Sequence, residues 1–405
     1  MEPAPPPFHR VVAHLDMDTF YVSVERLLDP SLEGLPVAVG GSPAGRGVIA
    51  SASYEARAYG VRSAMPTAEA LRLCPKLILV GRGFSEYAEY SRRIHEALLH
   101  FTPQVQMASQ DEAYLDLTGT ERLWGVPATA AERLRRTITA ETGLPCSVGI
   151  GSNKLVAKVG SGMAKPAGVR VVERGGEAAF LATLPVRKIP GVGPKSVAVL
   201  EAHGIRTCGE LAALDAEGAR ALFGDHGSEL VARARGESDA PVVVEAPPKS
   251  LSHEETFPQD TRDAEFLDGI LSNLCEKVAN RLRRHGARAA LVTLKYRYQG
   301  FETHTAARSL ADPTDDEVEL LRAARTLLAE NWNRGRAVRL LGVAAGNLVF
   351  GRAQLDLFAA AEDERKLRLH AAIDAIRGRH GYGAVRRASS AGRAEEKNEN
   401  QWGGG

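Results

Sequence analysis

The sequence predicts an α+β chain made of several domains, and three observations support that fold class. At 405 residues the chain is longer than an ordinary single domain. Strand and helix patterns alternate over residues 84–172, whereas residues 173–239 are helical, with many Ala and Gly residues. Residues 252–348 then follow the order strand, helix, strand, strand, helix, strand, which is typical of a two-layer α+β module.

The first part of the chain supplies the strands of a mixed sheet. Residues 11–15 are apolar and predict a buried strand that ends at Asp16. Two more strands, over residues 105–108 and 113–117, enclose Gln110, Asp111 and Glu112. The other elements expected here are a helix over residues 87–101, a helix over residues 130–142, a strand over residues 146–150 and an insertion with its own small core over residues 20–83.

Three carboxylates can meet where these strands end. Adjacent residues of a strand point to opposite faces, so Asp111 and Glu112 serve one site only if they lie at the bend of their hairpin. Asp16 would complete the cluster, which is repulsive unless a cation neutralises it. Oxygen ligands suit Mg²⁺, and two such ions close together are the apparatus of polymerases and nucleases. Each acid alone would fit a solvated strand end; the two segments together favour a metal site.

Composition and charge indicate the cellular location of the protein more than they indicate its function. The formal net charge of +1 argues neither for nor against a nucleic acid partner. The four cysteines are scattered without paired metal-ligand spacing and suit a reducing cytoplasm. The sequence shows no signal peptide and no apolar run that could span a membrane. We therefore expect a cytoplasmic protein, associated with the nucleoid if the source is bacterial, and no membrane partner.

Residues 51–57 predict the start of a helix. Ser51 and Ser53 are candidate N-caps, and a helix start offers free N–H groups to phosphate. Ser51, Tyr54 and Arg57 are spaced by three, so we expect them to share one face. An ordinary surface helix explains the same pattern.

A second phosphate-binding candidate lies at residues 189–195, Ile-Pro-Gly-Val-Gly-Pro-Lys, between helical stretches. This pattern is typical of a helix-hairpin-helix turn, whose glycines let backbone N–H groups approach a DNA phosphate. A plain glycine turn is the alternative. Residues 240–250 follow as an extended tether rich in Pro and Val.

Basic residues gather in the last module. They form two groups, Arg281, Arg283, Arg284, Arg288, Lys295, Arg297 and Arg308 on one side and Arg334, Arg336 and Arg339 on the other. Such a distribution suits duplex phosphates, although a charged run is usually a solvated surface. For the same reason Lys154 and Lys158, four residues apart on one predicted helix, are expected to form a solvated face.

Several segments in the same order resemble the motifs of the Y-family DNA polymerases, the translesion enzymes, and most closely their bacterial polymerase IV branch. The segments are residues 14–21, 50–66, 109–116, 149–154, 163–168 and 189–195, and the likeness extends from about residue 11 to residue 348. It implies a right-hand polymerase. Its domains would be a palm (9–19 and 84–172), inserted fingers (20–83), a helical thumb with the helix-hairpin-helix (173–239), a linker (240–250), a little finger (251–350) and a segment with a clamp-binding motif and tail (351–405).

The resemblance also implies roles for site residues. Asp16 and Asp111 would ligate two Mg²⁺ ions, Glu112 the ion nearer the primer end, and the backbone carbonyl of Met17 the nucleotide-side ion. Tyr21 would be the steric gate that excludes a 2′-hydroxyl, although taken alone it would fit a core aromatic. The residues implied for the triphosphate are Ser51, Tyr54, Arg57 and Lys165, and those for DNA are Gly191, Gly193, Lys195, Arg297 and Arg336. Gln110 departs from the apolar residue usual in its motif.

The segment after the last module resembles a peptide that binds the bacterial sliding clamp, the beta subunit. In Gln354-Leu355-Asp356-Leu357-Phe358, the glutamine can bond at a pocket rim while Leu355, Leu357 and Phe358 supply apolar anchors. The start of an amphipathic helix is the alternative. Helical residues 364–378, then 382–387, follow and could partly cover the motif, and residues 395–405 are expected to be disordered.

We therefore expect a monomeric, template-directed DNA polymerase of low fidelity that uses dNTPs on primer–template DNA and acts in translesion synthesis. A non-catalytic paralogue that binds DNA and clamp as a scaffold is a rival, but such relatives lose the carboxylates that this chain keeps. A palm-type nucleotide cyclase is a second rival. The helix-hairpin-helix turn and the basic module speak against it, because a cyclase grips no duplex.

Overall fold

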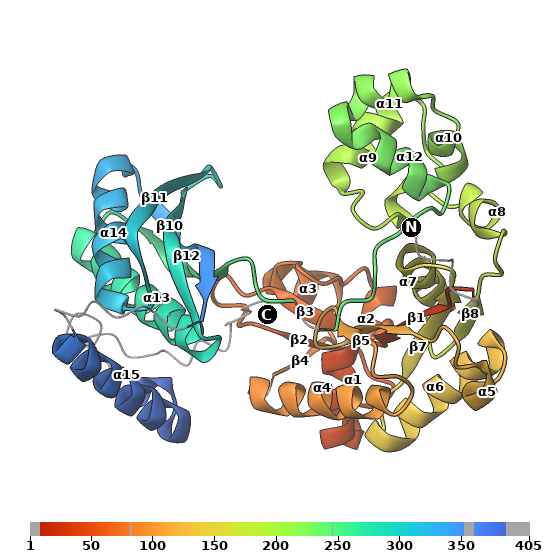
Figure 1. The fold of residues 1–405 in the computed structure, drawn as a ribbon, viewed down its shortest axis with the longest axis horizontal. Helices are drawn as coiled ribbons and strands as arrows, with labels where there is room; N and C mark the ends of the chain where they lie inside the picture. Colours follow the sequence, from red (N-terminus) through yellow and green to blue (C-terminus); the bar gives the residue numbers. More distant parts are fainter. Residues whose placement is uncertain (1–8, 82, 245, 352–359, 386–405) are drawn as a thin grey trace. The chain divides into compact units, whose positions relative to one another are not determined.

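The computed structural model describes residues 9–81, 83–244, 246–351 and 360–385. The chain divides into two compact units, residues 1–246 and residues 247–405. Figure 1 shows the elements of both units, coloured along the sequence. None of the helices in the described parts of the chain is long and apolar enough to cross a membrane.

The first unit is built on a five-stranded sheet in the order β5-β6-β1-β7-β8. The strands are β1 (Val12–Met17), β5 (Val105–Met107), β6 (Glu112–Asp116), β7 (Cys146–Gly151) and β8 (Val169–Val171). Neighbouring strands run antiparallel except β7 and β8, which run parallel. This confirms the predicted hairpin and the strand at residues 146–150. The first strand differs in one respect, because it continues through Asp16 to Met17.

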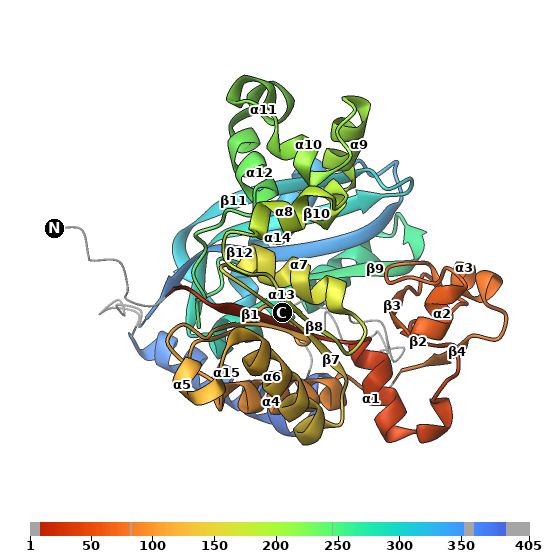
Figure 2. The same ribbon diagram turned by 90° about the vertical axis from the view of Figure 1, so that its right-hand side faces the viewer.

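Helices cover both faces of this sheet. In Figure 2, α4 and α6 lie below β1 and α7 lies above it. The helices of this part of the chain are α4 (Phe84–Leu99), α5 (Glu121–Trp124), α6 (Pro127–Thr142) and α7 (Lys154–Ala164). Asn153 caps α7, since its side chain accepts a hydrogen bond from the Val156 N–H group. Gly149 lets α7 approach β7 closely, because a Cβ atom at that position would lie 2.1 Å from the Ala157 carbonyl oxygen.

Residues 20–83 form a smaller body with its own sheet, in the order β3-β2-β4. Its elements are α1 (Phe20–Leu28), β2 (Val37–Gly40), β3 (Ile49–Ala52), α2 (Tyr54–Ala58), α3 (Thr67–Leu73) and β4 (Ile78–Val80). A separate apolar cluster that includes Ile49, Val61 and Leu77 packs inside it. The insertion therefore has the small core that the sequence predicted.

The stretch from residue 173 to residue 239 is helical, as predicted. It contains α8 (Glu177–Ala182), α9 (Pro194–Ala202), α10 (Cys208–Ala212), α11 (Ala216–Phe223) and α12 (Gly227–Ala234). These helices bury Leu181, Leu200 and Leu211 in one apolar cluster. The following residues carry no helix or strand over 240–244 and 246–250, which agrees with the expected tether.

The second unit has the predicted order β, α, β, β, α, β. The elements are β9 (Leu251–Thr261), α13 (Ala264–Arg284), β10 (Ala287–Tyr298), β11 (Thr303–Thr314), α14 (Glu317–Asn331) and β12 (Val338–Phe350). The strands form one antiparallel sheet in the order β11-β10-β12-β9. Leu271, Leu294 and Leu341 are fully or almost fully buried and belong to the core between the sheet and the two helices.

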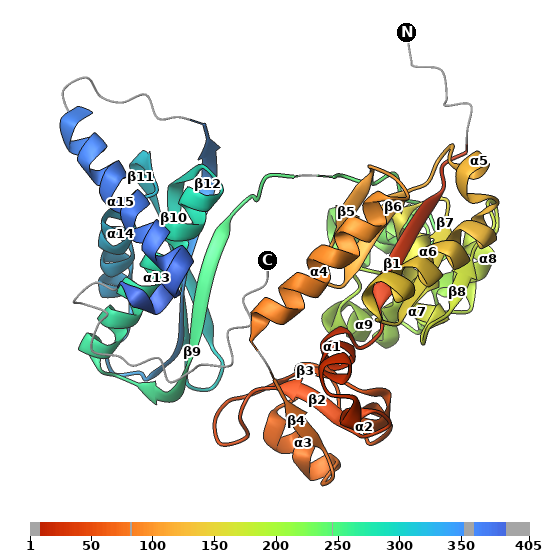
Figure 3. The same cartoon turned by 90° about the horizontal axis from the view of Figure 1, so that it is seen from below.

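A last helix, α15 (Ala360–His380), lies along α13 of the same unit, as Figure 3 shows. Ionic contacts hold it there: Arg377 pairs with the buried Glu276, and Asp374 accepts hydrogen bonds from Arg283 and Asn280. The helix predicted over residues 364–378 is confirmed and is longer at both ends. Arg283 was expected among the basic residues that face DNA; its side chain is instead 11% exposed, between Asp374 and Glu317.

His253 on β9 makes the stability of the second unit depend on pH. Burial, followed by the charges of Lys277 and Arg281, lowers the pKa of His253 from 6.5 to about 4. Between pH 6.5 and pH 4, His253 is therefore protonated in the unfolded chain but remains neutral in the folded unit. The free energy of unfolding falls as the pH decreases through this range. We expect this residue to account for at most about 3 kcal/mol of that fall. Urea unfolding of His253→Gln at several pH values should show a flatter pH profile than the parent protein.

The matched control is His285→Gln, which removes an exposed histidine of the same unit. It should leave the pH profile unchanged. Equal pH profiles for the parent protein and His253→Gln would show that His253 titrates normally in the folded unit.

Candidate active site

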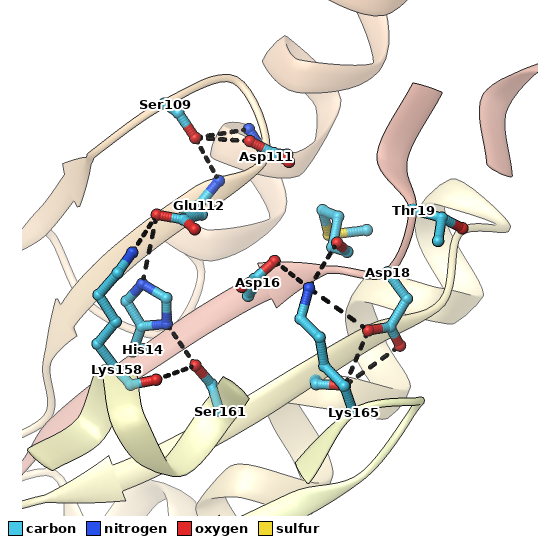
Figure 4. A network of polar contacts seen from close by, with 12 residues as sticks. His14, Asp16, Asp18, Thr19, Ser109, Asp111, Glu112, Lys158, Ser161 and Lys165 are labelled. Atoms are coloured by element: carbon cyan, nitrogen blue, oxygen red, sulfur yellow. Dashed lines mark hydrogen bonds and ion pairs between the residues drawn. The ribbon is translucent and has the colours of Figure 1, made fainter. Parts of the chain in front are cut away.

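The three predicted carboxylates meet at one end of the five-stranded sheet. Asp16 and Glu112 are directly opposite each other in the antiparallel register of β1 and β6. Asp111 lies at the bend just before β6, and its carbonyl oxygen accepts a hydrogen bond of 2.9 Å from the Met17 N–H group. The hairpin bend therefore brings Asp111 and Glu112 beside the end of β1, as the sequence required (Figure 4).

Each carboxylate has its own protein partner. The Ser109 hydroxyl donates to Asp111 Oδ1 at 2.6 Å, and the Glu112 N–H group donates to the same hydroxyl oxygen at 3.1 Å. Lys158 forms an ion pair with Glu112, and Lys165 donates to Asp16 Oδ1 at 2.6 Å. Burial raises the pKa of Asp16 to about 6, although Lys165 opposes the rise. The site is thus a group of acids that α7 and its following loop neutralise.

The donor set fits a hard divalent cation. Asp16, Asp111, Glu112 and the Met17 carbonyl offer only oxygen atoms, and oxygen is the ligand that Mg²⁺ prefers. The three carboxylates do not all lie within 4.8 Å of one another, a separation that the oxygen and nitrogen atoms of Asp316, Glu317 and His370 do reach in the second unit. That second group is structural, because Glu317 pairs with Arg283 and Asp316 caps α14.

The prediction that Lys154 and Lys158 form a solvated face is wrong. Lys154 donates to Gln106 Oε1 at 2.7 Å and lies over the Tyr114 ring at 4.6 Å. Lys158 lies against Glu112. The glycine-assisted packing of α7 on β7 turns this helix face toward the acids, which the helical period alone could not reveal.

His14 lies in the layer between the acids and α7. It is fully buried on β1, its Nδ1 lies 2.7 Å from the Ser161 hydroxyl, and its Nε2 lies 3.9 Å from Glu112 Oε2. Burial lowers its pKa well below 6.5, and the nearby lysines lower it further. His14 is therefore neutral and adds no charge to the site at neutral pH.

Asp18 is a functional candidate that sequence reasoning missed. It is 1% exposed, and its carboxylate accepts hydrogen bonds from the Ser147 hydroxyl at 3.0 Å and the Ala167 N–H group at 2.6 Å. Its Oδ1 also accepts from the Tyr54 hydroxyl at 3.4 Å. One signal was available: Asp18 follows Asp16 by two residues, the spacing that keeps one face of an extended chain.

The aromatic residue Tyr21 lies in the first turn of α1, beside Phe20 and Tyr87 with ring centroids at 5.3 and 4.6 Å. Its hydroxyl donates to Gln110 Oε1 at 3.3 Å. Burial, with the charge of Asp111, raises the pKa of Tyr21. Gln110, the residue that departs from the family pattern, therefore contacts the proposed steric gate.

The predicted helix start at residues 51–57 needs correction. Ser51 lies in strand β3, so it does not share a helical face with Tyr54 and Arg57. Ser53 is the N-cap of α2, since its hydroxyl oxygen accepts from the Ala56 N–H group at 3.1 Å. The Arg57 guanidinium lies 5.2 Å from the centre of the Tyr54 ring, and burial together with Asp18 raises the pKa of Tyr54 to about 12.

A glycine turn at residues 189–195 leads into the start of α9. Gly191 has φ +91°, a backbone conformation that disfavours other residues, and a Cβ there would lie 2.5 Å from Arg233 Nη1. Gly193 is the N-cap of α9, has open space at its Cβ position and brings no side chain to the first N–H groups. Lys195 lies in the first turn of the same helix.

The two arginines expected on DNA lie at one end of the second unit. Arg297 Nε donates to Thr303 Oγ1 at 2.7 Å, while Arg336 pairs with Glu302 and stacks over Tyr298 at 3.9 Å. Acids offset other basic residues as well, with Glu254 beside Lys295 and Glu330 beside Arg308. The predicted clamp residues Gln354, Leu355, Leu357 and Phe358 lie outside the described residues.

Comparison with known proteins bears directly on this site. Residues 15–162 match the impB/mucB/samB family, residues 174–205 match the IMS family HHH motif, and residues 248–357 match the impB/mucB/samB family C-terminal domain. A solved Y-family DNA polymerase chimera resembles the chain with a TM-score of 0.75 and 25% sequence identity, covering 84% of this chain and all of that one.

Two curated relatives are each 43% identical to this chain over the aligned residues. One is DNA polymerase IV of Caulobacter vibrioides, aligned over 376 residues that make up 92% of each chain. The other is DNA polymerase IV of Halorhodospira halophila, aligned over 351 residues that make up 87% of this chain and 99% of the relative. The chain belongs to the impB/mucB/samB family, the Y family of DNA polymerases, and the resemblance read from its motifs is confirmed.

Proposed function

We propose that this protein extends primers by template-directed nucleotidyl transfer from dNTPs, with low fidelity, in translesion synthesis. It is a DNA-directed DNA polymerase of the Y family, similar over nearly its whole length to proteins named DNA polymerase IV. The structural observation that best supports this reaction is the register of β1 and β6, which sets Asp16 opposite Glu112 with Asp111 at the adjoining bend. A primer-extension assay with purified protein, Mg²⁺ and dNTPs tests it.

We assign the carboxylates to two Mg²⁺ ions. Asp16 and Asp111 would hold both ions, Glu112 the ion nearer the primer end, and the Met17 carbonyl the nucleotide-side ion. Bound in this way, the metals would lower the pKa of the primer 3′-hydroxyl and balance charge on the triphosphate and the leaving pyrophosphate. The neutral His14 contacts Ser161 of α7, and Lys158 of the same helix pairs with Glu112. This side of the site would therefore hold the acids in place.

Five side chains are assigned to the nucleotide. Tyr54 and Arg57 are presented at the start of α2, next to Asp18, and would hold the β- and γ-phosphates. The Lys165 ammonium would offset charge on the leaving group. Ser51 lies on β3, just before Tyr54 and Arg57 in the chain, and would contact the triphosphate from that strand. Tyr21, held by Gln110 and Tyr87, would exclude a 2′-hydroxyl by its bulk.

The rest of the chain is assigned to DNA. Residues 9–19 and 84–172 would form the palm, residues 20–83 the fingers, residues 173–239 the thumb, residues 240–250 the linker and residues 251–350 the little finger. Gly191, Gly193 and Lys195 would contact a backbone phosphate through the first N–H groups of α9, and Arg297 and Arg336 would contact the duplex. Because Glu302 already pairs with Arg336, that contact requires the arginine to exchange partners.

The segment 351–405 is assigned to the bacterial sliding clamp, through Gln354, Leu355, Leu357 and Phe358, with the polymerase itself a monomer. The rival in which the chain is a non-catalytic scaffold lacks support. All three carboxylates are present and meet at one sheet end, whereas a scaffold has no need of them.

Asp111→Ala and Glu112→Ala should each abolish incorporation while leaving the fold and duplex binding intact. Both acids are half-buried at the hairpin bend, where they contribute to charge more than to packing. Loss of a metal ligand should slow single-turnover incorporation by about a thousandfold or more. Circular dichroism and duplex-binding titrations serve as controls, and near-parental extension at ordinary Mg²⁺ would contradict the metal assignment.

Tyr21→Ala should admit ribonucleotides. Removing the ring opens space at the sugar, so the ratio of kcat/KM for a matched dNTP to that for the corresponding rNTP should fall by about tenfold or more. Gln110→Leu is the matched control, because it removes the hydrogen bond to the Tyr21 hydroxyl and keeps the ring; its ratio should change far less. An unchanged ratio in a folded Tyr21→Ala protein would identify Tyr21 as a core aromatic.

Replacing Leu357 and Phe358 by Ala should spare distributive synthesis on a short primer and remove stimulation by the bacterial clamp. Losing two apolar anchors should weaken clamp binding by about 2–4 kcal/mol, enough to abolish a micromolar contact. Primer extension with and without loaded clamp, together with direct clamp binding, measures both effects. Equal clamp affinity of the variant and the parent would place the contact elsewhere, and absent synthesis by the parent would favour the scaffold.

A further inference from the structure

Lys165 is held by the same atoms that the proposed function gives to the nucleotide-side metal. Its Nζ donates to Asp16 Oδ1 at 2.6 Å and to the Met17 carbonyl oxygen at 3.3 Å. These are a carboxylate and a backbone carbonyl of one strand end, a pair that presents two oxygen atoms to a single cation. An ammonium group and a divalent cation cannot both occupy this position, because the two would overlap and their positive charges would repel each other at contact distance.

A second acid keeps the ammonium close to this position. Asp18 Oδ1 lies 3.8 Å from Lys165 Nζ, and Figure 4 shows the ammonium between Asp16 and Asp18. Asp18 is tied to Ser147 on β7 and to the Ala167 N–H group, two residues beyond Lys165. It therefore fixes the loop that carries Lys165 to the sheet that carries Asp16.

Tyr54, another side chain assigned to the triphosphate, also contacts Asp18, at 3.4 Å. Asp18 is thus the point where a side chain from the insertion and a side chain from the sheet end meet. Its carboxylate remains available to Lys165 when Asp16 is engaged by another cation.

We propose that Lys165 is an exchangeable counter-cation: it occupies Asp16 and the Met17 carbonyl until a divalent cation takes them, and it then turns, with Asp18 as its remaining acid partner, toward the triphosphate. This inference rests on the proposed metal assignment and adds a role for Lys165 before nucleotide arrives. It makes metal alone a weak ligand and the metal–nucleotide pair a strong one, because only the pair offers Lys165 a new anion as it leaves Asp16.

The test is binding of Tb³⁺, an oxygen-seeking ion whose luminescence is excited through nearby tyrosines, to the full chain without nucleotide. The specific signal is the part of the Tb³⁺ luminescence that is lost in the Asp16→Asn variant. Lys165→Met should raise the Tb³⁺ affinity by about tenfold or more, since a contact between charged groups is removed from the metal's own ligands. The same variant should raise KM for dNTPs, and Lys165→Gln provides a second variant with the same expectation.

Lys154→Met is the matched control. It removes a lysine of the adjoining helix that binds Gln106 and lies over Tyr114, so it reports the general effect of losing one positive charge nearby. Its Tb³⁺ affinity should change by no more than about threefold at low salt and by less at about 0.5 M KCl, where long-range attraction is screened. The gain from Lys165→Met should persist at that salt concentration, because direct competition is not screened in this way.

Three results would overturn the inference, and they differ in whether they also overturn the metal assignment. If the parent protein and Lys165→Met both bind Tb³⁺ through Asp16 with equal affinity, or if the gain disappears at high salt, Lys165 does not compete and the metal assignment stands. If the parent and both Lys165 variants show no Asp16-dependent Tb³⁺ binding, the proposed metal site and this inference fail together.

Discussion

Mutual repulsion among acids at the end of one sheet is the constraint on which the rest of this structure depends. The pairing of β1 with β6 sets Asp16 opposite Glu112, and the hairpin bend adds Asp111. The buried Asp18 follows two residues after Asp16. Charges of one sign this close are stable only with positive partners. Burial, together with the nearby charges of Glu112 and Asp111, raises the pKa of Asp16 to about 6. The charged form of this acid is therefore disfavoured at the site.

The positive partners come from one helix and the loop after it. Lys158 on α7 and Lys165 just beyond its end reach two of the acids because α7 lies unusually close to β7, where Gly149 leaves room for its backbone. Packing and electrostatics are therefore one arrangement here. A site assembled in this way offers oxygen ligands to a cation, and under our proposal Lys165 makes a metal ion alone a weaker ligand than a metal–nucleotide pair.

The second unit solves a different electrostatic problem. Many of its basic side chains are already paired: Arg283 lies between Asp374 and Glu317, Arg336 contacts Glu302, and Lys295 contacts Glu254. If this surface contacts duplex phosphates as we propose, its basic side chains would have to exchange partners, which favours contacts that are weak one by one and sensitive to salt. Such contacts suit a polymerase that must move along its template.

The sequence by itself determined the order of the elements, the family and the three carboxylates, because apolar periodicity and the spacing of acids at strand ends are local properties. It also located the hairpin bend that lets Asp111 and Glu112 serve one site. Only the tertiary structure decided the neighbours: Ser51 on a strand instead of a helix, Lys158 and Lys165 on the acids, Arg283 buried against α15 and Asp18 linking two segments. These features depend on which side chains meet across residues far apart in the chain, and no local pattern encodes such meetings.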